Sequence, residues 1–520
     1  FGSSCPPAVR LFSSGQGPCI PAPMPVQGDA VLGQDISGTN GSKASLGAAQ
    51  DLETTDCAEA QATAAPLRPL AAGGRGCAGI DVGAVWQMSS MCLGIGIFAL
   101  PYSFLKLGVV HGTVWIIVMG LFANAALQRL LDLAAEYGSV SYEELAERAF
   151  GKAGKLAMTI ITLVTTGIAT LSYLGAARSL LVGVAVAFFT DFDVNSVPGG
   201  VTVLGKAKDC TMLLVLCIAV LPKCLSRSMG ANAWISSGGV AAMCISSAFF
   251  VYSCARVLVL GCDDKDVCGG RPPAFAGNVA DTLQYVATLA FSFSMVFALF
   301  PVLEERTGSG VAEGALRLKS AVRASVTLSC VVYLLVGIGG ALAFGTGTQP
   351  LALQNLPLSQ PLAQVITLVV GVSVSLLVAI IAFPTLQSLE RLVGRCFQGG
   401  EAPESLRPWL VAGVGAVCVL VDAYLPTKIA FALTGSLGLA LGAYVMPCLL
   451  CLRLGAGAGT CQRAVTLLVL LFGCVLLFGS TPVTVMRLVQ GDSGPAPKTL
   501  SELICQHPQN FASLSQQVVV

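Results

Sequence analysis

Two glycines and a proline fall within eight residues of an apolar segment near residue 95. Gly94, Gly96 and Pro101 are poor helix formers. A break in a membrane-spanning helix frees N–H groups at one half-helix end and C=O groups at the other, and these groups can hold a carboxylate and an ammonium. A free amino acid carries both charges on adjacent atoms. The spacing alone favours a close helix crossing that needs small residues, and the alternative is a backbone site for a zwitterion at Gly94, Ile95 and Gly96, which a second interrupted span would favour.

A second apolar segment, 291–301, has a related composition. It carries Ser292 and Ser294 in its first half and Pro301 at its end. Serine hydroxyls can satisfy loosened backbone in a membrane, and the phenylalanines of the segment can line an apolar pocket. Interrupted spans at corresponding positions of two halves indicate a transporter's binding site. Because this segment lacks a central glycine, it predicts a break less strongly than the first segment does.

Ionisable residues are rare in the apolar segments, and this excludes most catalytic classes. The two histidines, His111 and His507, fall in a short loop and in the C-terminal tail, so no buried His is available for acyl transfer or for a Ser–His pair. Nor do two Asp lie deep in the segments, as an aspartyl intramembrane protease requires. Arg178 lies inside an apolar run and is a functional candidate, although its side chain can also extend to the membrane interface. We expect no enzyme, no metal site and no organic cofactor.

The composition is typical of a polytopic membrane protein. Of the 520 residues, 54% are hydrophobic and 11% are charged, against about 25% charged residues in soluble domains. A span needs about 20 apolar residues, and a window of that length predicts about eleven spans. They cover residues 84–106, 111–134, 156–188, 209–226, 231–258, 281–303, 323–344, 362–386, 408–425, 428–452 and 464–487.

The basic residues predict the orientation. With the N-terminus in the cytosol, the cytosolic flanks hold about 17 Lys and Arg and the opposite flanks about nine, in keeping with the positive-inside rule. Residues 1–80 are rich in Gly, Ala, Ser and Pro and predict a disordered cytosolic region. Residues 81–487 form the predicted membrane domain, and 488–520 a short C-terminal tail. The net charge of +1 gives no reason to expect nucleic-acid binding.

The stretch that follows the second predicted span has its own pattern. It opens with Ser141 and has Glu144 three residues later, which is the spacing of a capping box. A short amphipathic helix is predicted from there to Phe150 and Gly151. This helix is either a solvated cytosolic element or part of a gate.

Several motifs resemble the amino acid/auxin permease family. The stretch Gly94-Ile-Gly-Ile-Phe-Ala-Leu-Pro-Tyr102 is similar to the first-span signature of the family and is the most specific match. The resemblance covers nearly everything from about residue 80 to 487. Four further stretches are looser matches: Ser141–Leu145, Tyr173–Leu180, Pro384–Glu390 and Gly435–Leu439.

The resemblance implies an all-α, leucine-transporter-like fold. Such a fold has about eleven transmembrane helices, with a five-plus-five inverted repeat whose first and sixth helices are broken. The activity implied is secondary active transport of amino acids by alternating access. The substrate contacts implied are the backbone of three residues in the first span, three residues in the sixth and a tyrosine in the third: Gly94, Ile95, Gly96, Phe293, Ser294, Met295 and Tyr173.

The resemblance also bears on the coupling ion. Sodium-coupled members often have Asn where Ser90 stands here, and a hydroxyl in the eighth span, for which Ser373 and Ser375 are candidates. The missing Asn favours a proton over sodium, with Arg178 as a further candidate for coupling. Sodium coupling and exchange stay as alternatives, as does a membrane sensor that binds an amino acid without moving it. The expected partners are free amino acids and the lipid bilayer, in the plasma membrane or a vacuolar or lysosomal membrane.

Overall fold

The structure is a computed structural model of the chain. The predicted disordered region, half of the predicted fourth span 209–226 and nearly all of the predicted tail lie outside the residues that it describes. The described residues are 81–189, 214–216, 218, 221–225, 233–261, 270–275, 277–356, 361–394, 403–422, 425, 427–455 and 459–490.

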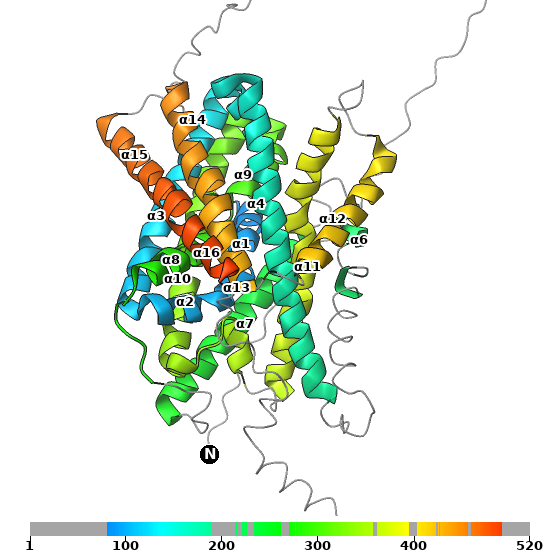
Figure 1. Cartoon of the computed structure of the whole chain (residues 1–520). Helices are drawn as coiled ribbons and strands as arrows, with labels where there is room; N and C mark the ends of the chain where they lie inside the picture. The colour runs from blue at the N-terminus through cyan, green and yellow to red at the C-terminus, as the bar shows by residue number, and fades with distance from the viewer. Residues whose placement is uncertain are drawn as a thin grey trace, which may run out of the picture. The chain divides into compact units, whose positions relative to one another are not determined.

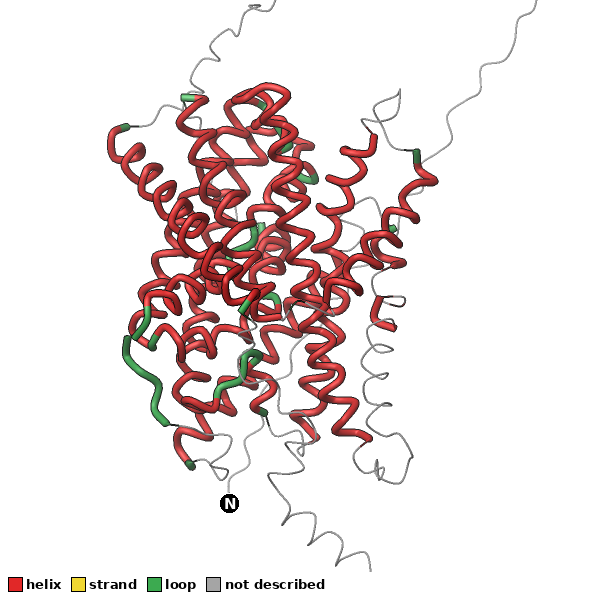
Figure 2. The backbone as a smooth tube through the Cα atoms, viewed as in Figure 1, coloured by secondary structure: helices red, strands yellow, loops and turns green. Residues whose placement is uncertain are grey.

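The described part of the chain is helical and contains no strand (Figure 2). Within it, eight helices are long and apolar enough to cross a membrane, or nine if a bent pair counts as one span. Every predicted span other than 209–226 coincides with a helix or helix pair, which confirms the prediction of an all-α polytopic membrane protein. The main helices are α3 (Val109–Tyr137), α4 (Tyr142–Phe189), α7 (Ala233–Leu260), α10 (Val311–Phe344), α11 (Pro361–Gly394), α12 (Arg407–Asp422), α13 (Thr427–Leu433), α14 (Met446–Leu454), α15 (Thr460–Val475) and α16 (Thr481–Val489).

The first span is interrupted where the glycines predict it. Helix α1 (Val82–Cys92) ends before Gly94, a short 3₁₀ turn follows, and α2 (Leu100–Leu107) continues at an angle of 43° to the first part. Gly94 is extended, with φ −102° and ψ −160°. Pro101 lies in the first turn of α2, where its missing N–H costs nothing.

The sixth predicted span is interrupted as well, although it has no central glycine. Helix α8 (Val279–Phe291) ends in a turn at residues 292–295, after which α9 (Val296–Glu304) begins. In this turn the N–H of Ser292 bonds Leu289 O at 3.1 Å, three residues back, instead of the carbonyl four residues back. The serine-rich stretch therefore loosens the helix without glycine.

The two interrupted spans run in opposite directions. Helix α1 packs on α9, and α2 packs on α8, so the first half of each span meets the second half of the other. This antiparallel pairing is what an inverted repeat produces, and the five-plus-five repeat itself stays a prediction. Helix α4 packs along α11, and α12 and the short α6 (Leu221–Cys224) pack on α11 in turn (Figure 1).

Helix α4 joins the predicted cytosolic helix to the third span. Gly151 has φ +68° and ψ −161° and breaks the helical path, at the residue where the sequence predicts the amphipathic helix to end. The predicted capping box is wrong in its partners. The Ser141 hydroxyl donates to Glu143 at 2.8 Å, and Glu144 accepts from the Ser139 hydroxyl at 2.8 Å. Glu144 is thus occupied by a nearer hydroxyl.

A π-helical segment, Thr434–Val445, lies against the interrupted sixth span. Its glycines permit the close approach. A Cβ at Gly435 would lie 1.8 Å from Ala287 O of α8, and a Cβ at Gly442 would lie 2.4 Å from the Phe297 ring of α9. The π-helical part of the tenth predicted span therefore packs directly against both α8 and α9, the two halves of the interrupted sixth span.

Candidate functional site

The two interruptions meet and are hydrogen-bonded to each other. The Ser294 hydroxyl, in the turn after α8, donates to Met91 O of α1 at 2.9 Å. The Tyr333 hydroxyl of α10 lies 2.6 Å from Cys92 O and 2.6 Å from Ser292 O. The carbonyl ends of α1 and α8 therefore lie next to each other inside the bundle.

Tyr173 closes this junction on the side of α4. Its hydroxyl lies so near Gly94 that a Cβ there would be 1.9 Å from the Tyr173 oxygen. A Cβ at Gly96 would lie 3.1 Å from the Ser292 Oγ. Ile95, between the glycines, is fully buried. The structure thus brings together Gly94, Ile95, Gly96 and Tyr173, which the sequence singles out, and glycine is required where the phenol approaches.

Phe291, which the sequence does not single out, forms an aromatic wall beside the glycines. Its ring lies edge-on to Tyr173 with centroids 6.0 Å apart, and it stacks on Phe431 of α13 at 4.9 Å. Its Cδ1 would lie 3.4 Å from a Cβ at Gly96. The wall therefore combines rings from α4, α8 and α13.

Phe293, which the resemblance implies as a substrate contact, has its ring elsewhere. It lies edge-on to Tyr333 at 5.3 Å and faces Gly120 of α3. Side chains two residues apart on a helical path point in different directions. For this reason the ring beside the glycines is that of Phe291, and the role of Phe293 as a substrate contact stays a prediction.

Ser294 and Met295 lie in the turn between α8 and α9. The Ser294 hydroxyl is engaged with Met91 O, so any direct contact of this hydroxyl with a ligand has to compete with that bond. The Met295 side chain is fully buried. The roles of both residues as substrate contacts stay predictions.

The candidates for ion coupling lie on three helices. Ser90 of α1 and Ser375 of α11 are buried, and each hydroxyl donates to a carbonyl of its own helix at 2.7 Å. Such a hydroxyl keeps its lone pairs for a cation. Ser373 of α11 and Arg178 of α4 are half-buried. Their roles also stay predictions.

A cavity of about 460 Å³ opens beside the second interruption. Val296 and Phe297, the first residues of α9, belong to its lining, together with the start of α4 and the end of α11. Its volume lies in the range of small-molecule sites. The cavity therefore extends from this end of the bundle to the start of α9, next to the junction.

Charged and aromatic contacts hold the rim of this cavity. Glu143 of α4 pairs with Arg391 of α11 at 2.8 Å, and both residues line the cavity. The Tyr142 hydroxyl donates to Gly442 O at 2.8 Å, and its ring stacks on Phe300 of α9 at 5.3 Å. The predicted cytosolic helix is thus part of the cavity wall.

Near the same end, α1 is fixed to the end of α9. Asp81, directly before α1, pairs with Arg306 at 2.8 Å and accepts the Ala84 N–H at 3.0 Å. Burial alone would raise the pKa of Asp81, but the hydrogen bonds from Arg306 and Ala84 and the charge of Arg306 outweigh it and lower that pKa. The carboxylate is therefore held in its charged form.

The other end of the interrupted spans is packed. Tyr102 of α2 lies edge-on to Tyr285 of α8 at 5.7 Å. The N–H of Val109 bonds Pro273 O at 3.0 Å, and Gly108, with φ +85°, presses on the loop at residues 274–275. The molecule therefore has an accessible end at α9 and a packed end at α2 and α8.

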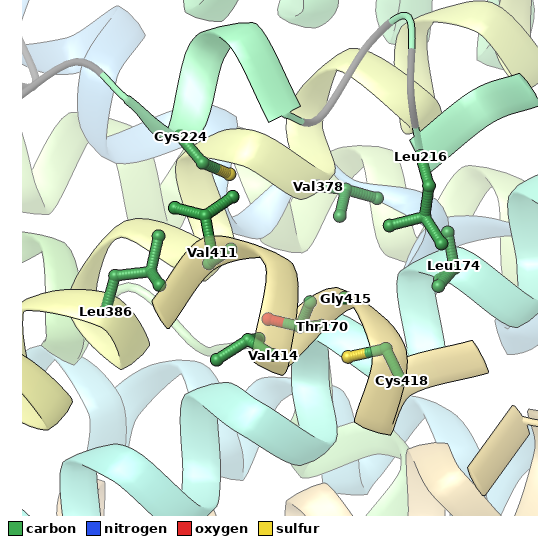
Figure 3. Close-up of a pocket in the computed structure, with 11 residues that line it drawn as sticks. Thr170, Leu174, Leu216, Cys224, Val378, Leu386, Val411, Val414, Gly415 and Cys418 are labelled. Atoms are coloured by element: carbon green, nitrogen blue, oxygen red, sulfur yellow. The ribbon is translucent and has the colours of Figure 1, made fainter. Parts of the chain in front are cut away.

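A second, much smaller cavity lies between α4, α6, α11 and α12 (Figure 3). Its volume of about 20 Å³ has room for roughly one water. Its lining is mostly aliphatic, with Leu174, Val378 and Val411 among the side chains, and the Thr170 hydroxyl bonds its own helix. This cavity is a small packing gap between the helices and lacks polar groups for an amino acid.

Comparisons with known proteins cover most of the described chain. A family model described as "Transmembrane amino acid transporter protein" matches residues 82–486. The amino acid transporter AVT6E of Arabidopsis thaliana is 24% identical over 412 residues, 76% of this chain and 81% of that protein. The sodium-coupled neutral amino acid symporter 2 of Danio rerio is 24% identical over 333 residues, 60% of this chain and 63% of that protein. The crystal structure of MhsT in complex with L-phenylalanine aligns with a TM-score of 0.49 and 14% identity, over 79% of this chain and 98% of that chain.

Proposed function

This chain belongs to the transmembrane amino acid transporter family, and we propose that it moves free amino acids across a membrane by alternating access. The observation that carries the proposal is the junction of two interrupted spans inside an apolar bundle. Irregular backbone at membrane depth is tolerated where it is buried in protein or lines a cavity, and this junction adjoins the cavity of about 460 Å³.

The proposed substrate site uses backbone for the common part of an amino acid. The substrate carboxylate binds the amides near Gly94, Ile95 and Gly96, and the ammonium binds carbonyls of the opposite interruption. The side chain then lies against the rings of Tyr173 and Phe291. Such a site recognises the charged groups of the amino acid with its backbone, and it selects the side chain by the shape of the aromatic wall.

The proposed route of release is the cavity between α4, α9 and α11. With the N-terminus in the cytosol, this cavity faces the cytosol, and the packed end at α2 and α8 faces the outer or lumenal side. The conformation then corresponds to the half of the transport cycle in which the cytosolic side holds the open cavity and the opposite side is packed. In the other half of the cycle, Tyr102 and Tyr285 have to move apart, and the cavity beside Glu143 has to close.

For the driving ion we propose a proton. This rests on Ser90 at the position where sodium-coupled relatives often have Asn. Sodium is the second candidate, because one relative in Danio rerio is named as a sodium-coupled symporter and the hydroxyls of Ser90, Ser373 and Ser375 can serve as oxygen ligands. Exchange without a driving ion is the third.

A single uptake screen tests these proposals. Purified protein in proteoliposomes is given each common amino acid at two pH values, with and without sodium. Proton coupling predicts uptake that rises when the outer or lumenal side is acidified. Uptake that depends on sodium and ignores pH replaces the proton by sodium. Substrate binding without uptake identifies a sensor instead of a transporter. The same protein expressed with a fluorescent tag reports whether it resides in the plasma membrane or in a vacuolar or lysosomal membrane.

A further inference from the structure

One buried hydroxyl lies between the ends of both interrupted helices. Tyr333 of α10 is fully buried, and its oxygen lies 2.6 Å from Cys92 O and 2.6 Å from Ser292 O. Cys92 is the last residue of α1, and Ser292 directly follows α8. Carbonyls at a helix C-terminus lack a helical partner and carry negative partial charge.

The two carbonyls need a hydrogen-bond donor or a cation between them. Unpaired carbonyls in an apolar interior are costly, and two of them facing one point also repel each other. In membrane transporters, half-helix C-terminal ends of this kind coordinate a cation. Here the phenol oxygen fills that point, and its single proton is donated to one carbonyl or shared between both.

Other contacts hold Tyr333 against the junction. On the same face of α10, eight residues earlier, the Ser325 hydroxyl bonds the Ser89 hydroxyl of α1 at 2.8 Å. The Phe293 ring packs edge-on against the Tyr333 ring at 5.3 Å. Helix α10 is therefore fixed to α1 and to the turn after α8, so that the position of the phenol oxygen is determined by both spans.

We propose that Tyr333 is a positioning residue that joins the two interruptions, so that the ends of α1 and α8 move as one unit and need no cation between them. The joining of the two ends stands on geometry alone, and only its effect on transport rests on the proposed function. Removal of the hydroxyl leaves both carbonyls without their shared donor. The two segments should then open more often, and they should do so together.

The test compares Tyr333→Phe with Tyr444→Phe in the full-length protein in nanodiscs. Tyr444 is a matched control, because it is also buried and its hydroxyl has no hydrogen-bond partner among the described residues. Hydrogen–deuterium exchange is followed by mass spectrometry in peptides that cover residues 91–96 and 292–296. We expect exchange of both peptides to rise about tenfold in Tyr333→Phe and in neither for Tyr444→Phe. A rise in one peptide alone, or in neither, overturns the proposal.

A second variant keeps the proposal testable if Tyr333→Phe does not fold. Ser294→Ala removes the Ser294–Met91 bond and leaves the phenol in place. Because Tyr333 still joins both ends, the two peptides should keep matched exchange rates in this variant. Separate rates in Ser294→Ala would show that Tyr333 does not join the spans.

Uptake gives an independent readout of the effect on transport. In Tyr333→Phe the maximal rate should fall about tenfold with a smaller change in KM, because the hydroxyl orders the moving ends and does not touch the substrate. If exchange rises in both peptides while no amino acid is transported even by the wild type, the joining role stands and the proposed function fails. A wild-type maximal rate in a folded Tyr333→Phe protein overturns the role in transport.

Discussion

Replacement of Gly94 by alanine tests the geometry of the junction directly. The added Cβ would lie 1.9 Å from the Tyr173 oxygen and 2.8 Å from its Cζ, whereas ordinary contact begins near 3.4 Å. The phenol or the backbone must therefore move by about 1.5 Å to reach the distances of ordinary packing. Overpacking of this kind costs about 1–3 kcal/mol, which corresponds to a change of about 5- to 150-fold in an equilibrium.

Two other glycines give the matched series. A Cβ at Gly96 would lie 3.1 Å from the Ser292 Oγ, a side-chain atom that can rotate away, and a Cβ at Gly167 of α4 would have its nearest neighbour at 4.0 Å. Initial uptake in proteoliposomes and the melting temperature in detergent are measured for each alanine variant. We expect the largest loss in Gly94→Ala, a smaller loss in Gly96→Ala and wild-type behaviour in Gly167→Ala.

Two outcomes would refute this reasoning. Wild-type uptake and melting in Gly94→Ala would mean that Tyr173 does not approach the chain at this point. Equal losses in Gly94→Ala and Gly167→Ala would mean that the effect comes from the general change of glycine to alanine. The double variant with Tyr173→Leu should recover the melting temperature, because leucine lacks the outer ring atoms, and it should not recover uptake if Tyr173 contacts the substrate.

Three further predictions concern the rim and the supports of the site. Glu143→Arg should impair uptake by placing two cations at the rim, and the exchange of charges with Arg391→Glu should restore it; no recovery in the double variant would contradict the ion pair. Asp81→Asn should lower the melting temperature at pH 7 by no more than the effect of about 1 kcal/mol expected for an exposed pair. Because the folded protein lowers the pKa of Asp81 below 3.8, the stabilisation is present above that pH and is lost as the pH falls through the folded value, so wild type and variant should converge in acid; a difference that persists there argues against the pair. Gly435→Ala should destabilise the protein by at least about 1–3 kcal/mol, since the Cβ would lie 1.8 Å from Ala287 O, and unchanged melting would contradict this contact.

The membrane spans and the first interruption follow from the sequence because their signals are local. A window of apolar residues is enough to place a span, and Gly94, Gly96 and Pro101 are enough to weaken a helix. The interruption after Phe291 has a weaker local signal, since Ser292 and Ser294 also occur in intact helices. Its formation depends on the partners that the loosened backbone finds in other helices.

The details of the junction could not be predicted, because they depend on packing between distant segments. Tyr333 is 241 residues from Cys92 in sequence, and no pattern of apolar residues connects the two. Hydropathy places Phe291 and Phe293 in the same apolar segment, while the direction of each ring is set by the turn that begins at Ser292. The cavity could not be predicted either, because its wall is formed by α4, α9 and α11, which are distant in sequence and meet only in the folded protein.

The backbone at Gly151 has a consequence for how the accessible end is controlled. Its combination of φ +68° and ψ −161° belongs to a region that only glycine occupies without strain. The short helix before it carries Tyr142 and Glu143, while the long helix after it crosses the bilayer. We expect this residue to act as a pivot, because rotation about its backbone would move the short helix at the entrance of the cavity without bending the third span. A side chain at residue 151 would stiffen that pivot and slow the opening step while leaving the affinity of the buried site as it is.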